Sequence, residues 1–174
     1  MNLCKIQCWR RHIQGRGGWA IAAGVGGRGF NSKMASSTSS SSKGERKAIH
    51  KKLSVLIVEN EDIAQTAYIL CLQKCGAETL GVRNGAVAVK IHDITQMRFD
   101  LILMSSTMPI MDGIEATKKL RSMGITTMIV GMPTQSDNEE YRKEFMEAGL
   151  DKCYEQPLTM ETFQSLIEKV SNKV

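Results

Sequence analysis

The sequence lacks a long hydrophobic run, and this excludes a membrane-spanning helix. A span needs ~18 consecutive apolar residues, and the apolar stretch at residues 19–25 is far shorter. The composition is that of an ordinary soluble protein, with 42% hydrophobic and 24% charged residues. A chain of 174 residues has room for one domain and a tail. We therefore expect no membrane partner.

Acidic residues are almost absent from the first 52 positions. Residues 1–52 contain eleven Lys or Arg and one acid, Glu45, for a net charge of +10. Residues 53–174 contain twelve Lys or Arg and seventeen acids, for a net charge of −5. The sequence pI of about 9.0 therefore reflects a basic tail. Because the remainder is acidic, we expect no nucleic-acid partner.

Residues 1–52 are predicted to be a disordered tail, because Gly/Arg-rich sequence and the serine tract at 39–42 cannot bury a core. The lack of acids loosely fits an organellar transit peptide, but residues 1–31 contain no serine. A start of translation at Met34 is an alternative. Residues 24–29 match G-x-G-x-x-G, yet polyserine follows where a dinucleotide-binding helix is required. We therefore reject a dinucleotide-binding site. Because the transit peptide is only loosely supported, we expect a cytoplasmic or nuclear protein.

The cysteines do not have the spacing of a zinc site. Cys4 and Cys8, and likewise Cys71 and Cys75, are four residues apart with no histidine near either pair. We predict free thiols and no metal site, with Cys71 and Cys75 as small core residues of a helix.

From Leu53 onward, short apolar runs alternate with helical patterns, as in a sheet buried on both faces. Five strands alternating with five helices predict a doubly wound α/β fold with a parallel sheet. Ligands of such folds bind beyond the carboxyl ends of the strands. The predicted strands are residues 53–58, 79–82, 101–104, 128–130 and 153–154.

The first helix is predicted over residues 61–75, with an apolar face that ends before Gly76. Residues 136–139 resemble a capping box that would start a helix at Ser136. Gly149 is predicted to end that helix. The first helix's predicted apolar face is Ile63, Ala67, Leu70 and Cys71, and that of the last helix is Phe163, Leu166, Ile167 and Val170.

The basic residues of the central helical segment, Lys118, Lys119 and Arg121, are predicted to form a solvated helix face. Most of the eleven methionines are expected to fill the core and anchor loops.

The segment after the third strand, Met108-Pro109-Ile110-Met111-Asp112-Gly113, resembles the M-P-x-M-D-G segment of response-regulator receivers. Residues 53–174 match that family in order and spacing. They are most similar to plant type-C or pseudo-response regulators. The resemblance implies the five-stranded flavodoxin-like receiver fold, strand order 2-1-3-4-5, with Met108, Pro109, Asp112, Gly113 and Pro157 as family loop residues.

The resemblance also places the receiver's phosphorylation site, and the sequence departs from it at nearly every position. The acid pair aligns with Glu59 and Asn60, and the phosphoacceptor aspartate with Ser105. The switch hydroxyl aligns with Pro133, and the lysine that neutralises the phosphoryl group with Gln156. We therefore expect no catalytic residue and no phosphate acceptance.

Mg²⁺ binding is expected to be lost or weak, because this ion dehydrates reluctantly and would gain little from Glu59 alone. Glu61 and Asp62 are an alternative acid pair, but acids at these positions are favoured by the helix dipole anyway. Phosphorylation of Ser105 by a serine kinase is a second alternative, although its position in the pocket opposes access.

The resulting hypothesis is a monomeric, non-enzymatic two-component signalling module, linked by the resemblance to plant cytokinin signalling. It would bind histidine-phosphotransfer proteins or histidine kinases without being switched by phosphate. The alternatives are a conventional response regulator with a non-standard acceptor and, third, an α/β enzyme on the same fold. We expect no effector domain after the receiver-like segment and therefore no direct DNA binding.

The resemblance further predicts a cis peptide bond between Gln156 and Pro157. Thr159 is then predicted to cap a helix that begins at Met160, with Glu161 in its first turn.

Overall fold

The computed structural model describes residues 52–172. The predicted basic tail, the rejected glycine-rich motif and the alternative start at Met34 lie outside these residues. Within the described part, no helix is both long and apolar enough to cross a bilayer.

Five parallel strands form the sheet, in the order β2-β1-β3-β4-β5, as predicted. The strands are β1 (Ser54–Val58), β2 (Glu78–Val82), β3 (Leu101–Ser105), β4 (Met128–Met132) and β5 (Lys152–Cys153). The helices are α2 (Asp62–Lys74), α3 (Gly85–Thr95), α4 (Gly113–Ser122), α5 (Glu139–Glu147) and α6 (Met160–Ser171). Each predicted strand is therefore present, with bounds within two residues of the prediction.

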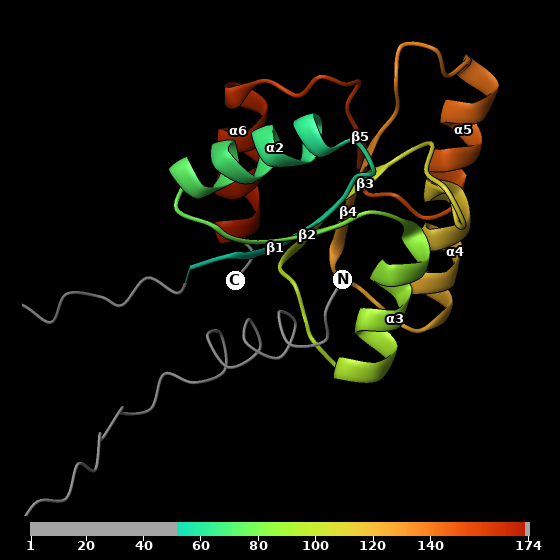
Figure 1. Cartoon of the computed structure of the whole chain (residues 1–174), viewed down its shortest axis with the longest axis horizontal. Coiled ribbons are helices and arrows are strands. Elements are labelled where there is room, and N and C mark those ends of the chain that lie inside the picture. Colours follow the sequence, from blue (N-terminus) through green and yellow to red (C-terminus); the bar gives the residue numbers. More distant parts are fainter. Residues whose placement is uncertain (1–51, 173–174) are drawn as a thin grey trace, which may run out of the picture. The chain divides into compact units, whose positions relative to one another are not determined.

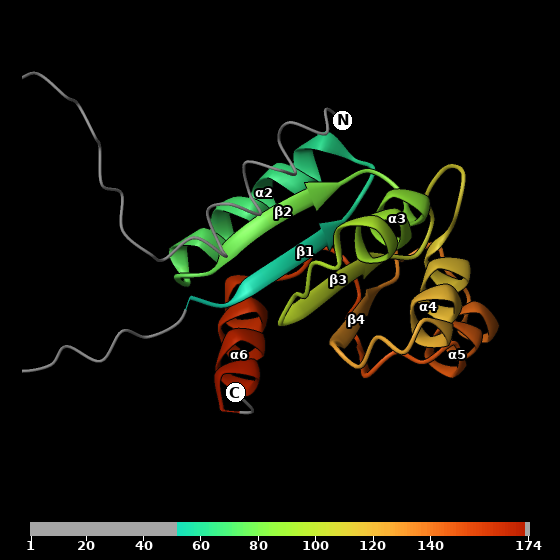
Figure 2. The same cartoon turned by 90° about the horizontal axis from the view of Figure 1, so that it is seen from below.

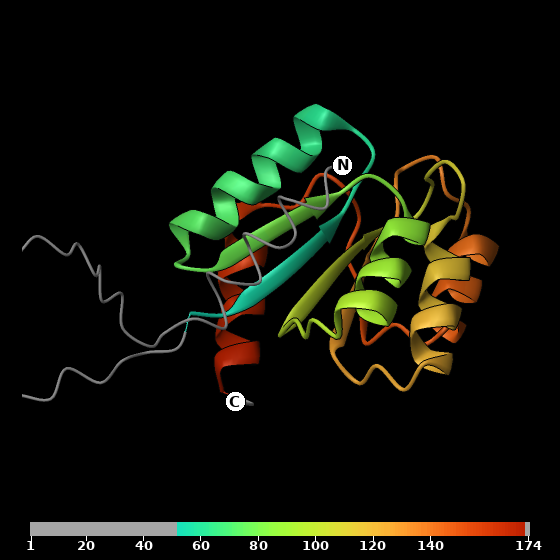
Figure 3. The ribbon, with the colours of Figure 1, turned by 60° about the horizontal axis from the view of Figure 1, so that its bottom comes forward.

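Helices cover both faces of the sheet (Figures 1 and 2). α2 and α6 lie on one face, and α3, α4 and α5 lie on the other, which Figure 3 shows from a third direction. Alternate residues of β1 serve the two faces: Val55 and Ile57 join the core beneath α2 and α6, whereas Leu56 and Val58 point the other way. This double burial explains why the strands read as continuous apolar runs.

The predicted apolar face of α2 is wrong. Ile63 is 86% exposed and Leu70 is 54% exposed, whereas Tyr68 and Leu72 are the helix's buried residues. α2 carries apolar side chains on two stripes, and the large side chains of the second stripe pack into the core. Periodicity alone does not distinguish two competing stripes. Ala67 is exposed as well, and Cys71 is partly buried.

The predicted capping box of α5 is also wrong. The helix begins at Glu139, and its N-cap is Asn138, whose side chain accepts a hydrogen bond from the Tyr141 backbone at 2.8 Å. Asp137 instead accepts from the Thr134 backbone at 2.7 Å. A run of three cap-forming residues, at 136–138, left the starting position open.

The α6 predictions are confirmed. The helix begins at Met160, and the Thr159 side chain caps it through the Thr162 backbone. Phe163, Leu166 and Val170 are buried, and Ile167 packs against the same cluster. The Gln156–Pro157 peptide bond is cis, as predicted.

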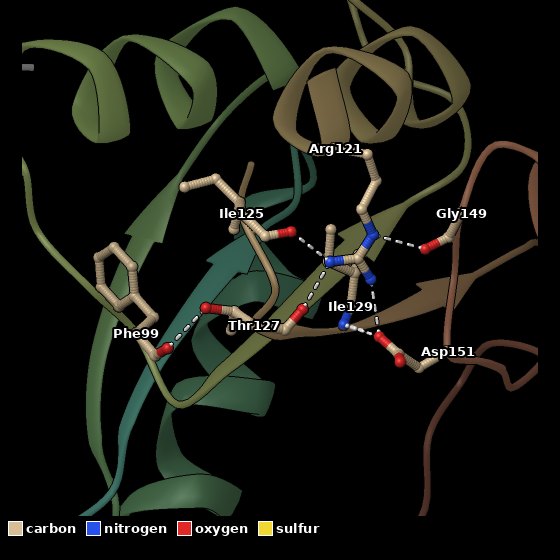
Figure 4. A network of polar contacts seen from close by, with 7 residues as sticks. All are labelled: Phe99, Arg121, Ile125, Thr127, Ile129, Gly149 and Asp151. Atoms are coloured by element: carbon tan, nitrogen blue, oxygen red, sulfur yellow. Dashed lines mark hydrogen bonds and ion pairs between the residues drawn. The ribbon is translucent and has the colours of Figure 1, made fainter. Parts of the chain in front are cut away.

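Arg121 is not part of a solvated face, which corrects the prediction for α4 (Figure 4). Its guanidinium donates to the carbonyl oxygens of Gly149, Ile125 and Thr127 at 2.7–2.9 Å. It also pairs with the Asp151 carboxylate at 2.7 Å. That carboxylate accepts from the Ile129 backbone at 2.8 Å. Arg121 therefore joins the end of α4 to the loops that lead into β4 and β5.

Candidate functional site: a polar cluster at the carboxyl ends of the strands

The polar residues predicted from the sequence meet at the carboxyl ends of β1, β3 and β4. Glu59 follows β1 directly and is 2% exposed, and Ser105 ends β3 and is also 2% exposed. β1 and β3 are neighbours, and the strand order reverses direction at β1. Such a switch point is where doubly wound sheets bind ligands.

The Gln156 side chain joins these groups from the loop after β5. Its amide nitrogen lies 3.2 Å from Glu59 Oε2, 3.2 Å from Ser105 Oγ and 2.9 Å from the Met132 carbonyl oxygen. Its backbone N–H donates to the Pro133 carbonyl at 2.8 Å. Because an amide NH₂ has two protons, three acceptors share them. Gln156 therefore links β1, β3 and β4.

Tyr68 of α2 completes this network. Its hydroxyl donates to the Gln156 side-chain oxygen at 3.3 Å. Burial raises the pKa of the Tyr68 hydroxyl, and the nearby Glu59 charge raises it further. Tyr68 was not among the predicted site residues. A buried tyrosine usually directs its hydroxyl to a polar partner, so a tyrosine among the helix's apolar residues was the available signal.

Glu59 is held by N–H donors on both carboxylate oxygens. Oε1 accepts from the Glu61 backbone at 3.1 Å. It also lies 3.3 Å from the Asn60 amide nitrogen, in the orientation that satisfies the neighbours of that amide. The same nitrogen donates to the Thr107 carbonyl at 3.1 Å. Asn60 therefore acts as a donor where the receiver pattern has a second carboxylate.

The Glu59 carboxylate, the acid of the predicted pair that remains, faces hydrogen-bond donors. Mg²⁺ takes oxygen ligands in octahedral geometry, but Oε2 of Glu59 faces the donor end of the Gln156 amide. Within residues 52–172, no cluster of three or more His, Cys, Asp or Glu side chains suits a metal ion. Asp62 of the alternative acid pair forms an ion pair with Arg83 at the protein surface.

The loop between β3 and α4 holds the residues of the predicted family motif. Asp112 caps α4 by accepting from the Glu115 backbone at 2.8 Å, and Met108 is buried. A Cβ at Gly113 would collide with the Ser105 carbonyl oxygen and the Phe145 ring. The motif glycine is therefore required by close packing. Pro109 and Ile110 are exposed at the tip of the loop.

Pro133 is buried at the end of β4, at the position of the predicted switch hydroxyl. It has no hydroxyl or N–H to offer a bound anion. Its neighbour Ser106 is fully buried, and its carbonyl accepts from the Tyr141 hydroxyl at 3.0 Å. Burial raises the pKa of Tyr141, as do the nearby charges of Asp112, Asp137 and Glu144. This side of the site therefore offers a neutral tyrosine hydroxyl that is already hydrogen-bonded.

A five-stranded parallel sheet in this order, with a buried polar cluster at the switch point, defines a receiver-type α/β domain. Residues 55–168 match the family of the response regulator receiver domain. The chain belongs to that family.

The relatives include plant response regulators. The chain is 43% identical to the two-component response regulator ARR22 of Arabidopsis thaliana, over 71% of this chain and 87% of the relative. It is 42% identical to the two-component response regulator 24 of the same plant, over 69% and 85%. It is 35% identical to the two-component response regulator ORR41 of rice, Oryza sativa, over 68% and 94%. The predicted resemblance to plant response regulators is confirmed.

Solved receiver domains have the same fold. One is the receiver domain of a sensor histidine kinase from Pseudomonas aeruginosa, at TM-score 0.63 and 24% identity, covering 70% of this chain and 98% of that one. A magnesium ion is coordinated in the active-site cleft of that protein. Another is the chemotaxis protein CheY4 of Vibrio cholerae, at TM-score 0.61 and 25% identity, covering 68% and 98%.

Proposed function

We propose that this chain is a two-component signalling module that binds its partner without accepting phosphate. The observation that carries the proposal is the Gln156 amide between Glu59 and Ser105. In a working receiver this space holds an acceptor carboxylate, a metal ion and a lysine. Here it is filled by a neutral side chain hydrogen-bonded to three acceptors.

The chemistry of the cluster supports this proposal. Phosphoryl transfer needs positive charge at the transferring group and an activated nucleophile. Gln156 supplies no charge, and Ser105 Oγ is contacted by an amide donor rather than by a base. His92, the histidine of the described residues, lies on α3 and bonds to the Ala88 carbonyl at 2.9 Å. Ser105 is also too buried to meet a serine kinase without opening of the fold.

We further propose that the partner is a histidine-phosphotransfer protein and that it docks on the outer face of α2. That face presents Ile63, Ala67 and Leu70 to solvent, and α2 begins three residues after Glu59. Adjacent apolar side chains exposed on one helix face are typical of a protein-binding surface. The plant relatives support a role in a plant phosphorelay, and we propose cytokinin signalling as its setting.

Calorimetric titration of the full chain with unphosphorylated histidine-phosphotransfer proteins tests this proposal. Binding is expected without acetyl phosphate and is expected not to change when acetyl phosphate and Mg²⁺ are added. Ile63→Asp and Leu70→Asp should each weaken binding about tenfold or more, which corresponds to about 1.4 kcal/mol.

Ile94→Asp is the matched control, because Ile94 is 59% exposed on α3, on the opposite face of the sheet. It should leave the affinity unchanged. An equal loss of affinity in Ile63→Asp and Ile94→Asp would show that α2 is not the docking surface. Binding that requires acetyl phosphate would overturn the phosphate-independent mechanism.

A further inference from the structure

Three sulfur-containing residues lie where the end of α2 meets the start of α6. Cys71 lies in the last turn of α2, Cys75 is the C-cap residue directly after this helix, and Met160 is the first residue of α6. Cys75 Sγ is 3.9 Å from Met160 Sδ. Both cysteines are free thiols, and both pack against the buried cluster that α2 shares with α6.

The separation of the Cys75 and Met160 sulfurs matches that of two ligands around one metal ion. With metal–sulfur bonds of about 2.3 Å, two sulfurs of a trigonal site lie about 4 Å apart. Cys75 and Met160 already have this separation. Cys71 is four residues before Cys75, so their Cβ atoms are about 5–6 Å apart on the same helix face. The site requires the Cys71 side chain to turn its sulfur toward the other two.

We propose that Cys71, Cys75 and Met160 form a three-sulfur binding site for Cu(I). Thiolates and a thioether are soft ligands, and this combination selects Cu(I) over harder cations. Zn²⁺ would require a fourth ligand of the Cys, His or carboxylate type. Within the described residues no His, Asp or Glu completes such a set.

A groove gives an ion access to two of the three proposed ligands. Cys75 and Met160 line a groove of about 490 Å³, together with Lys74, Gln164, Ile167 and Glu168. Burial raises the pKa of the Cys75 thiol, and the neighbouring Cys71 raises it further. Binding of Cu⁺ forms two copper–thiolate bonds and one copper–thioether bond, and it releases two protons to solvent.

Competition with a chromophoric Cu(I) chelator under anaerobic, reducing conditions tests the site. The protein is the full chain carrying Cys4→Ser and Cys8→Ser, so that these two thiols do not bind the ion. One Cu(I) should bind per chain, with release of about two protons. Cys71→Ser and Cys75→Ser should each weaken binding by about two orders of magnitude, and Met160→Leu by about one.

Two variants keep this test independent of folding. Met160→Leu conserves volume, so it should remove the thioether without disturbing the core. Cys153→Ser removes a free thiol on β5 and should leave Cu(I) affinity unchanged. The proposal is overturned if Met160→Leu and Cys75→Ser bind Cu(I) as tightly as the parent. It is equally overturned if Cys153→Ser weakens binding as much as Cys75→Ser does.

Discussion

Replacing Arg121 with alanine removes the side chain that joins α4 to the loops before β4 and β5. Arg121→Ala deletes hydrogen bonds to three carbonyl oxygens and the ion pair with Asp151. A hydrogen bond to a charged group contributes about 1.5–3 kcal/mol. The Arg121 side chain is 25% exposed, so water replaces part of what is lost. We expect a loss of about 2–4 kcal/mol of unfolding free energy, which lowers Tm by roughly 6–15 °C.

Urea unfolding at neutral pH measures this loss, and two variants calibrate it. Lys118→Ala breaks the exposed pair with Glu144 on the same helix and should cost less than about 0.5 kcal/mol. Arg121→Lys keeps the charge but lacks the planar fork of donors, so it should recover less than half of the loss. If Arg121→Ala were as mild as Lys118→Ala, the carbonyl contacts of Arg121 would not stabilise the fold.

Three further predictions concern stability. Burial lowers the pKa of His92 below its usual value of 6.5. The unfolded chain therefore binds more protons, and His92 contributes stability above pH 6.5 that is lost as pH falls below it. His92→Phe should flatten this decrease in urea unfolding between pH 7 and pH 5, and an unchanged slope would contradict the assignment. Asn138→Ala should lower the free energy of unfolding by about 1 kcal/mol in thermal unfolding, whereas Ser136→Ala should lower it by under about 0.5 kcal/mol. The reverse order would show that Ser136, as in the predicted capping box, caps the helix. Gly113→Ala should destabilise by about 1–3 kcal/mol in urea, because the new methyl group meets the Phe145 ring, and a neutral effect would show that the loop has room.

The fold was predictable because its strands are buried on both faces and are separated by helical patterns. Continuous apolar runs such as residues 101–104 have few other interpretations. It was harder to predict which side of a helix packs inward. α2 has apolar residues on both of its faces, and only the packed structure selects Tyr68 and Leu72 over Ile63 and Leu70.

The members of the candidate site were predicted through the resemblance to receivers, whose functional residues follow the strands. The structure brings Glu59, Ser105 and Gln156 within hydrogen-bonding distance. The hydrogen bonds that join the residues of the site were not predictable. Tyr68 reaches Gln156 across 88 positions of sequence, and no local pattern reveals such a contact. The role of Arg121 was hidden for the same reason, since its partners are mainly backbone carbonyls.

Phosphoryl transfer tests the central claim most directly. The full chain is incubated with Mg²⁺ and a radiolabelled, phosphorylated histidine-phosphotransfer protein, beside Ser105→Asp and the triple variant Asn60→Asp/Ser105→Asp/Gln156→Lys. We predict no label on the natural chain, little on the single variant, and clear labelling of the triple variant. The single variant still lacks the second carboxylate and the lysine. Transfer of label to any of residues 53–174 of the natural chain would contradict the account.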